Sequence, residues 1–255
     1  MLSEPKIEFT KDNIDLYLKE VAKEYRRAVK KGMHAELILI GGASILINYG
    51  FRNMTTDIDS LIFAASSMKD AINKVRDRYG LPNGWLNEDF KRTDSYTPRL
   101  AQFSVYYRTY SNILTIRTVA AEHLIAMKLR SGRRYKSDLS DIIGILAEHE
   151  KKGAPITLEM VRRAVSDLYG EWESISSESR LFIENIMQQG NFEQIYKHVK
   201  DDENETKKLM VHFENSYPGV TKKNNVDTII DSLQKKANKE DILMLLRQKA
   251  DNPEN

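Results

Sequence analysis

The stretch ELILIGGASILINYGFRNMTTDIDSLIF, residues 36–63, decides how this chain folds. It opens with an apolar run at residues 37–40, which is short enough to be a buried strand. A Gly-Gly pair ends that run, and an amphipathic segment at residues 43–49 follows, with Gly50 as the expected helix C-cap. A second strand, residues 57–63, begins with Asp-Ile-Asp. The stretch therefore predicts a strand, a turn, a helix and a second strand.

Two aspartates occupy alternate positions of the second predicted strand. Strand side chains alternate in direction, so we expect Asp57 and Asp59 on one face and Ile58 in the core. Two neighbouring carboxylates repel each other unless a cation or a proton lies between them. Mg²⁺, or Mn²⁺ in its place, takes carboxylate and phosphate oxygens, and two such ions would hold the attacking and leaving oxygens of a phosphoryl or nucleotidyl transfer. Asp57 and Asp59 are therefore the predicted metal ligands.

The Gly-Gly pair, Gly41 and Gly42, is the predicted binding site for a phosphate. A turn without side chains lets backbone N–H groups approach a phosphate, and the N-terminus of the following helix adds a favourable dipole. Ser44 offers a hydroxyl donor to the same group. Each motif alone, Gly-Gly or Asp-x-Asp, also occurs in ordinary turns and strand ends. Their combination in strand–turn–helix–strand order is far more specific.

The segment GGASILINYGFRNMTTDID, which starts at Gly41, resembles the first motif of the polymerase-beta-type nucleotidyltransferase superfamily. In that motif a Gly-Gly or Gly-Ser turn between a strand and a helix precedes an Asp-x-Asp strand. The Thr-Thr pair before Asp57 is similar to the AbiEii-like group of bacterial toxins and its uncharacterised relatives. The strong resemblance covers residues 35–65, and a weaker one covers residues 119–146.

The weaker resemblance centres on the run KLRSGRRYKSDLSD, which starts at Lys128. In the toxin-like relatives a Lys on this helix and an Asp after an Arg-rich turn belong to the active site, which implies that role for Lys128 and Asp138. Arg133 and Arg134 are candidates to hold a triphosphate or an RNA backbone. The alternative is a basic helix end stabilised by the helix dipole, with Asp138 or Asp141 in the first turn of the next helix.

The resemblance implies an enzyme that transfers NMP from an NTP to a hydroxyl of RNA, tRNA included, or of a protein. It also implies the toxin of a toxin–antitoxin or phage-defence system, with a cognate antitoxin as partner. Polymerase-type members usually carry a third carboxylate on a later strand, and the predicted strands at residues 103–108 and 113–117 contain no acid. Two alternatives therefore stay open. One is a nucleotide-binding or protein-interaction module that has lost turnover, and the other is a phosphotransferase resembling the aminoglycoside-modifying enzymes of the superfamily.

The composition of the 255-residue chain, with 41% hydrophobic and 30% charged residues, is that of a globular protein. A formal net charge of +2 gives no strongly basic field, so any nucleic-acid site must be a local patch. The absence of cysteine excludes disulfides and thiolate chemistry. The polar N-terminal residues lack a signal-peptide core, and no apolar run is long enough to span a bilayer. We therefore expect a cytoplasmic protein without a membrane partner.

Two domains are predicted. Residues 1–152 are expected to form a nucleotidyltransferase-like α+β domain, with a small mixed sheet of at least four strands and flanking helices. Its first helix is expected at residues 11–31, ended by Gly32. From residue 155 onward every segment has helical periodicity and no strand signal appears. Residues 153–255 are therefore a predicted all-helical domain.

Overall fold

The chain divides into two compact units. The computed structural model describes residues 7–133, 136–222 and 225–236. The first unit consists of the described parts of Met1–Gly132 and Asp141–Phe192, and the second of those of Arg133–Ser140 and Glu193–Asn255. A unit of compact packing is not the same as an independently folding domain. The predicted domain division between residues 152 and 153 therefore stays a prediction.

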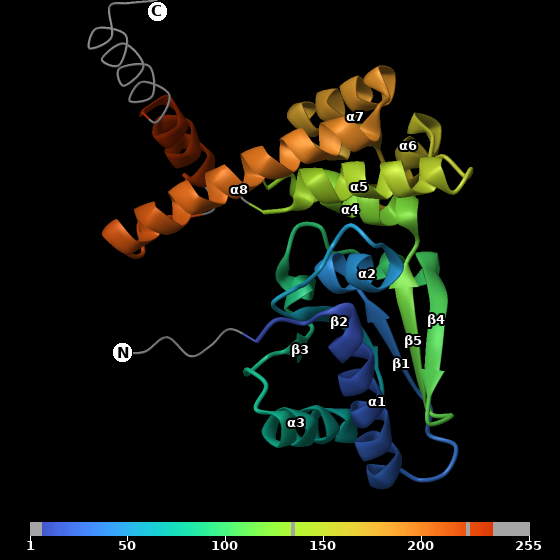
Figure 1. Cartoon of the computed structure of the whole chain (residues 1–255). Helices are drawn as coiled ribbons and strands as arrows, with labels where there is room; N and C mark the ends of the chain where they lie inside the picture. The colour runs from blue at the N-terminus through green and yellow to red at the C-terminus, as the bar shows by residue number, and fades with distance from the viewer. Residues whose placement is uncertain (1–6, 134–135, 223–224, 237–255) are drawn as a thin grey trace, which may run out of the picture. The chain divides into compact units, whose positions relative to one another are not determined.

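A five-stranded mixed sheet lies in the first unit, with the strand order β3-β2-β1-β5-β4 (Figure 1). The strands are β1 (Ala35–Leu39), β2 (Ile58–Phe63), β3 (Leu86–Asn87), β4 (Ser104–Tyr110) and β5 (Leu114–Val119). β1 pairs antiparallel with β2 and parallel with β5, and β4 runs antiparallel beside β5. The sheet and the many helices confirm the predicted α+β fold, and its five strands meet the expected minimum of four.

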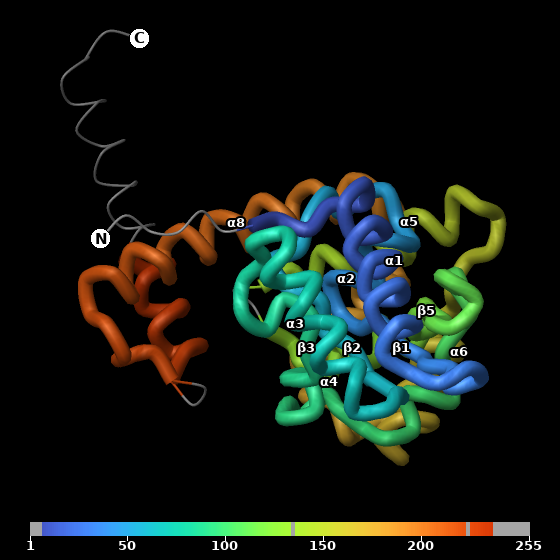
Figure 2. The backbone as a smooth tube through the Cα atoms, turned by 90° about the horizontal axis from the view of Figure 1, so that it is seen from below, coloured from blue at the N-terminus to red at the C-terminus, as the bar shows by residue number. Residues whose placement is uncertain are grey.

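The helices α1 (Lys11–Ala28) and α3 (Ser67–Tyr79) lie side by side in both views of the backbone (Figure 1 and Figure 2). Their apolar stripes share one core with the sheet, in which Ile14 of α1 is buried together with Leu37 and Leu39 of β1. Leu37 and Leu39 reach that core together because alternate strand residues point to one face. This packing fixes β1 and, with it, the turn that follows.

The other helices come mostly from the second half of the chain. They are α2 (Gly41–Asn48), α4 (Ala121–Ser131), α5 (Asp138–Lys151), α6 (Leu158–Tyr169), α7 (Ser177–Gln189) and α8 (Phe192–Ser216), with short 3₁₀ helices at Asp89–Arg92, Pro98–Phe103 and Trp172–Ser174. α6 and α7 pack against α4. After residue 155 the described chain contains no strand, which confirms the predicted helical character of this half. No described helix is both long enough and apolar enough to cross a membrane.

Two helix ends differ from the prediction. α1 ends before Val29 rather than at Gly32, and α2 ends before Tyr49 rather than at Gly50. Val29 and Tyr49 are extended C-caps, and each still donates its N–H to the carbonyl four residues earlier. A helix that ends in an extended residue needs no glycine in the left-handed conformation, so neither glycine is required at these ends.

Candidate active site

The turn between β1 and α2 is formed by the glycine pair itself. α2 begins at Gly41, two residues earlier than predicted, so both glycines belong to its first turn. Gly41 has a φ of +55°, a left-handed conformation that residues with a side chain rarely adopt. The first N–H groups of a helix have no acceptor within it, and they point out of its N-terminal end. The glycine pair therefore presents backbone donors directly after β1.

Asp59 of β2 lies beside this turn. A side-chain carbon added at Gly41 would be 3.8 Å from Oδ2 of Asp59. The N–H of Ile40 donates to the carbonyl oxygen of Asp59 at 2.9 Å, where the antiparallel strands β1 and β2 run side by side. The two parts of the motif, glycine turn and acidic strand, are therefore neighbours in space.

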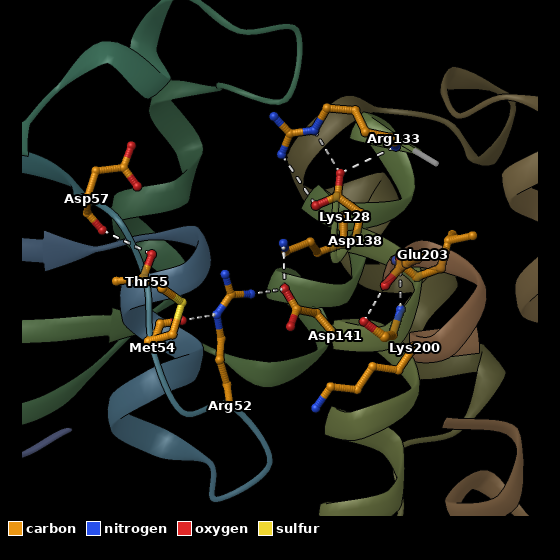
Figure 3. A network of polar contacts seen from close by, with 12 residues as sticks. Arg52, Met54, Thr55, Asp57, Lys128, Arg133, Asp138, Asp141, Lys200 and Glu203 are labelled. Carbon is orange, nitrogen blue, oxygen red and sulfur yellow. Dashed lines mark hydrogen bonds and ion pairs between the residues drawn. The ribbon is translucent and has the colours of Figure 1, made fainter. Parts of the chain in front are cut away.

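Asp57 stands immediately before β2, which begins at Ile58. Ile58 is fully buried and Asp57 is exposed. Thr55 holds the backbone ahead of the strand. Its carbonyl and N–H pair with Phe9 at 2.8 and 2.9 Å, and its hydroxyl donates to the carbonyl oxygen of Asp57 at 3.2 Å (Figure 3). Ile58 points into the core, so strand alternation directs Asp59, the next residue of β2, to the opposite face. The strand was expected to begin at Asp57 but begins one residue later, so alternation within β2 does not place Asp57 on that face.

A buried carboxylate, Asp141 of α5, joins two cations (Figure 3). Its Oδ2 accepts hydrogen bonds from Nζ of Lys128 at 2.8 Å and from Nη1 of Arg52 at 2.5 Å. The Asp141 and Lys128 side chains are only 4% and 10% exposed, whereas that of Arg52 is 21% exposed. Charges this deeply buried are stable only when they are paired. Asp141 thus fixes the position of the predicted active-site lysine.

Two side chains pack closely against Gly42. A side-chain carbon at this position would lie 2.7 Å from Oγ1 of Thr55 and 2.9 Å from Nη2 of Arg52, both closer than real side-chain carbons are found. The missing side chain lets the Arg52 guanidinium and the Thr55 hydroxyl lie against the first turn of α2. Gly42 therefore connects the glycine turn to the network around Asp141.

Ser44, the predicted hydroxyl donor to a phosphate, lies inside the protein. The residue is completely buried, and its hydroxyl has no hydrogen-bond partner among the described residues. A hydroxyl that solvent cannot reach contacts a phosphate only if α2 moves. The role predicted for Ser44 stays a prediction.

Asp138 and Arg133, two further predicted site residues, belong to the second unit. Asp138 is completely buried, and both its oxygens accept hydrogen bonds from the Arg133 guanidinium, at 2.9 and 3.3 Å. Glu203 of α8 accepts from the N–H groups of Leu139 and Ser140 and so caps the first turn of α5. These contacts anchor the start of a helix. The predicted catalytic role of Asp138 stays a prediction, and Arg134 lies outside the described residues.

The donor chemistry at Asp57 and Asp59 fits a divalent metal that arrives with a nucleotide. The described part of the chain contains no group of three or more His, Asp or Glu side chains arranged to hold a metal. Mg²⁺ often takes only one or two protein carboxylates and completes its octahedron with water and substrate phosphates. The missing side chain at Gly41 also leaves room beside the Asp59 carboxylate. The residues therefore suit a metal shared with substrate rather than one held by the protein alone.

Two residues of this region were missed as site residues by the sequence reasoning. Arg52 lies inside the motif itself, between the glycine turn and Asp57, but nothing in its local pattern separates it from a surface arginine. Asp141 was considered only as a residue of the first helical turn. Its contact with Arg52 joins residues 89 positions apart, and only the assembled fold brings such residues together. The available signal was a second acid three residues after Asp138, in the run that begins at Lys128.

Comparisons with known proteins place the chain in a family. No curated protein and no solved structure matches the chain. The profile of one protein family, described as "Nucleotidyltransferase of unknown function (DUF6036)", matches residues 17–176. This range contains the glycine turn, Asp57, Asp59 of β2 and the cluster around Asp141. The match covers more than half of the chain and agrees with the resemblance seen in the sequence, so the chain belongs to this family of nucleotidyltransferases of unknown function.

Proposed function

We propose that the protein is a metal-dependent nucleotidyltransferase that transfers NMP from an NTP to a hydroxyl group. The observation that carries this proposal is the position of the Asp59 carboxylate, 3.8 Å from where a side chain at Gly41 would begin. A carboxylate for a metal and backbone donors for a phosphate are thus adjacent, as a bound metal–nucleotide complex requires.

In this proposal the N–H groups of Gly41 and Gly42, with the dipole of α2, bind the triphosphate. Lys128 offsets the charge of the triphosphate as a compact cation. Asp57 and Asp59 would hold Mg²⁺ or Mn²⁺, which when bound supplies Lewis-acid stabilisation of the phosphoryl oxygens and lowers the pKa of a bound hydroxyl. The acceptor oxygen bonds to the α-phosphorus, the bond to the bridging oxygen breaks, pyrophosphate leaves with that electron pair, and the acceptor proton goes to solvent.

The acceptor in this proposal is RNA, with tRNA as one form, or a protein hydroxyl. Support comes from the resemblance of residues 41–59 to the toxin-like group. The net charge gives no such support, because +2 does not produce a general field that attracts nucleic acid. The same resemblance supports a role as the toxin of a toxin–antitoxin or phage-defence system, in which a cognate antitoxin would bind the chain. We place this activity in the cytoplasm.

A second candidate is a nucleotide-binding module of the same fold that no longer turns over. One observation favours it. Neither β4 nor β5 carries an acid, and the described residues contain no cluster of three metal-ligating side chains. A site with two carboxylates can bind a metal–nucleotide complex, while the third carboxylate of polymerase-type enzymes contributes to holding the metals during transfer.

Radiolabelled nucleotides separate these functions. The full chain is incubated with each NTP, labelled at the α- or the γ-phosphate, together with Mg²⁺ and either total RNA or cell lysate. We expect α-label on RNA or protein, and its loss when EDTA removes the metal. Transfer of γ-label instead would indicate a phosphotransferase, and Mg²⁺-dependent binding without transfer would indicate the inactive module. Absence of both binding and transfer would reject the nucleotidyltransferase.

A further inference from the structure

Arg52 has a hydrogen-bond donor that the fold directs to the glycine turn and leaves without an acceptor. Nε of Arg52 donates to the carbonyl oxygen of Met54 at 3.1 Å, and Nη1 donates to Asp141. Nη2 lies 2.9 Å from where a side chain at Gly42 would begin, and no residue in the described ranges accepts a hydrogen bond from it. The Arg52 side chain is 21% exposed, so solvent or a ligand can reach it.

The direction of that donor indicates what it can bind. The Cα–Cβ bond of a helical residue tilts toward the helix N-terminus. A group at the missing side chain of Gly42 therefore lies toward the end of α2 from which the free backbone N–H groups emerge. A planar guanidinium beside such N–H groups is suited to an anion with several oxygens, because it can donate to two of them at once.

We propose that Arg52 binds the phosphate tail of the nucleotide, and that Asp141 is the positioning residue that holds Arg52 there. This inference rests on the nucleotide site proposed above and adds a ligand to it. One Asp141 oxygen binds both Arg52 and Lys128, so a single buried carboxylate sets the places of two cations. Asp141 acts through these side chains and needs no contact with the nucleotide.

The orientation of Arg52 separates this role from that of an ordinary ion pair. A lysine at position 52 has a single nitrogen, and when this nitrogen pairs with Asp141 its other N–H groups start from the same point and not from the place that Nη2 takes beside Gly42. Arg52→Lys should therefore keep the fold while losing the phosphate contact. Arg108 of β4 provides the matched control, because its Nη1 also donates to a carboxylate, that of Asp15 in α1, at 2.8 Å.

The experiment is calorimetric titration of the full chain, in the presence of Mg²⁺, with a non-hydrolysable NTP, with inorganic tripolyphosphate and with the corresponding NMP. Arg52→Gln and Arg52→Lys are expected to weaken NTP and tripolyphosphate binding about tenfold or more, the effect of one lost charge-assisted hydrogen bond. NMP binding should stay the same, and Arg108→Gln should change none of the three affinities. Thermal unfolding identifies any variant that has lost its fold.

The outcomes separate the two proposals. An NTP affinity of Arg52→Lys equal to that of the wild type would overturn the role of Arg52 and leave the nucleotidyltransferase standing. No NTP binding by the wild type would remove the nucleotide site and this inference with it. For Asp141, Asp141→Asn should weaken tripolyphosphate binding, and the double variant with Arg52→Gln should lose less than the product of the two single losses. Fully multiplicative losses would reject the positioning role.

Discussion

Asp138 and Asp141, two acids three residues apart in the first turn of α5, are both buried but bind different partners. Asp138 binds Arg133, only five residues before it, and lies next to the Glu203 cap in the second unit. Asp141 binds Lys128, 13 residues before it, and Arg52, 89 residues before it, in the first unit. The Asp138 contact is local, whereas the Asp141 contacts depend on the tertiary fold.

The difference in sequence separation explains what each acid can do. A contact across five residues can form as soon as the turn before the helix forms, and it stabilises that turn. A contact across 89 residues forms only after the sheet and α5 have assembled, so it can set the geometry of a site on the folded protein. We therefore expect Asp141 to act at the candidate site and Asp138 to stabilise the start of α5, while the catalytic role predicted for Asp138 stays to be tested.

The largest expected effect tests whether the first unit, which contains Asp59 and Asp141, carries out the transfer. Asp59→Asn should lower the transfer of α-labelled NMP by more than about a hundredfold, since a lost metal ligand costs at least as much as a lost partner of one. It should also remove the gain in NTP affinity that Mg²⁺ provides, measured by calorimetry. Asp77→Asn, at an exposed position of α3, is the control. If Asp59→Asn transfers NMP as fast as the wild type, Asp59 of β2 takes no part in the reaction.

The next effect compares the two acids directly. Asp141→Asn should lower kcat/KM for transfer by about ten- to a hundredfold, the usual cost of removing a residue that orients a site side chain. Asp138→Asn should retain most of the transfer activity and lower the free energy of unfolding by about 1 kcal/mol, because Arg133 is 38% exposed and remains solvated.

Labelled-NTP kinetics and urea unfolding of both variants, below their melting temperatures, give the answer. If Asp138→Asn removes transfer without reducing stability, Asp138 is the active-site residue that the resemblance implies, and the assignment of the two acids must be exchanged.

The sequence predicted local structure well and the contacts of the site only in part. The run at residues 37–40 and the Asp-Ile-Asp segment were recognisable because burial and strand period act on neighbouring residues. The start of α2 at Gly41 was not predicted, because a Gly-Gly pair in a sequence is typical of a loop. In the structure Gly41 has a positive φ and is nevertheless the first residue of the helix. The contacts of Arg52 could not be predicted from the sequence. Its guanidinium donates a hydrogen bond to Asp141, which is distant in the sequence, and it also lies in the space left by the missing side chain of Gly42. Such through-space contacts leave no periodic pattern.

A smaller effect concerns the cap of α5. Glu203→Gln should lower the free energy of unfolding by about 1 kcal/mol, the usual cost of weakening an N-terminal cap, because an amide accepts the N–H groups of Leu139 and Ser140 less strongly than a carboxylate. Glu205→Gln, at an exposed position of the same helix, is the matched control. Urea unfolding measures both. Equal stability of the two variants would show that this cap does not stabilise α5.

The smallest expected effect concerns RNA and the basic run that begins near the end of α4. The sequence suggests a phosphate-binding track of Arg130, Arg133, Arg134 and Lys136. In the structure Arg130 lies over the ring of Tyr169, and Arg133 is engaged by Asp138. An arginine already bound to a carboxylate exchanges one partner for another when it meets a phosphate, so its net contribution to RNA binding is reduced.

The double variant Arg133→Ala with Arg134→Ala is therefore expected to weaken RNA binding only a few-fold. Its plot of log affinity against log salt should flatten by no more than about one unit, the effect of one lost phosphate contact. Filter binding across a salt series measures the slope, and NTP calorimetry on the same variant should show an unchanged affinity. A slope change near two units would mean that both arginines contact RNA and that the Asp138 pair opens on binding. A lost NTP affinity would instead place them in the triphosphate site beside Arg52.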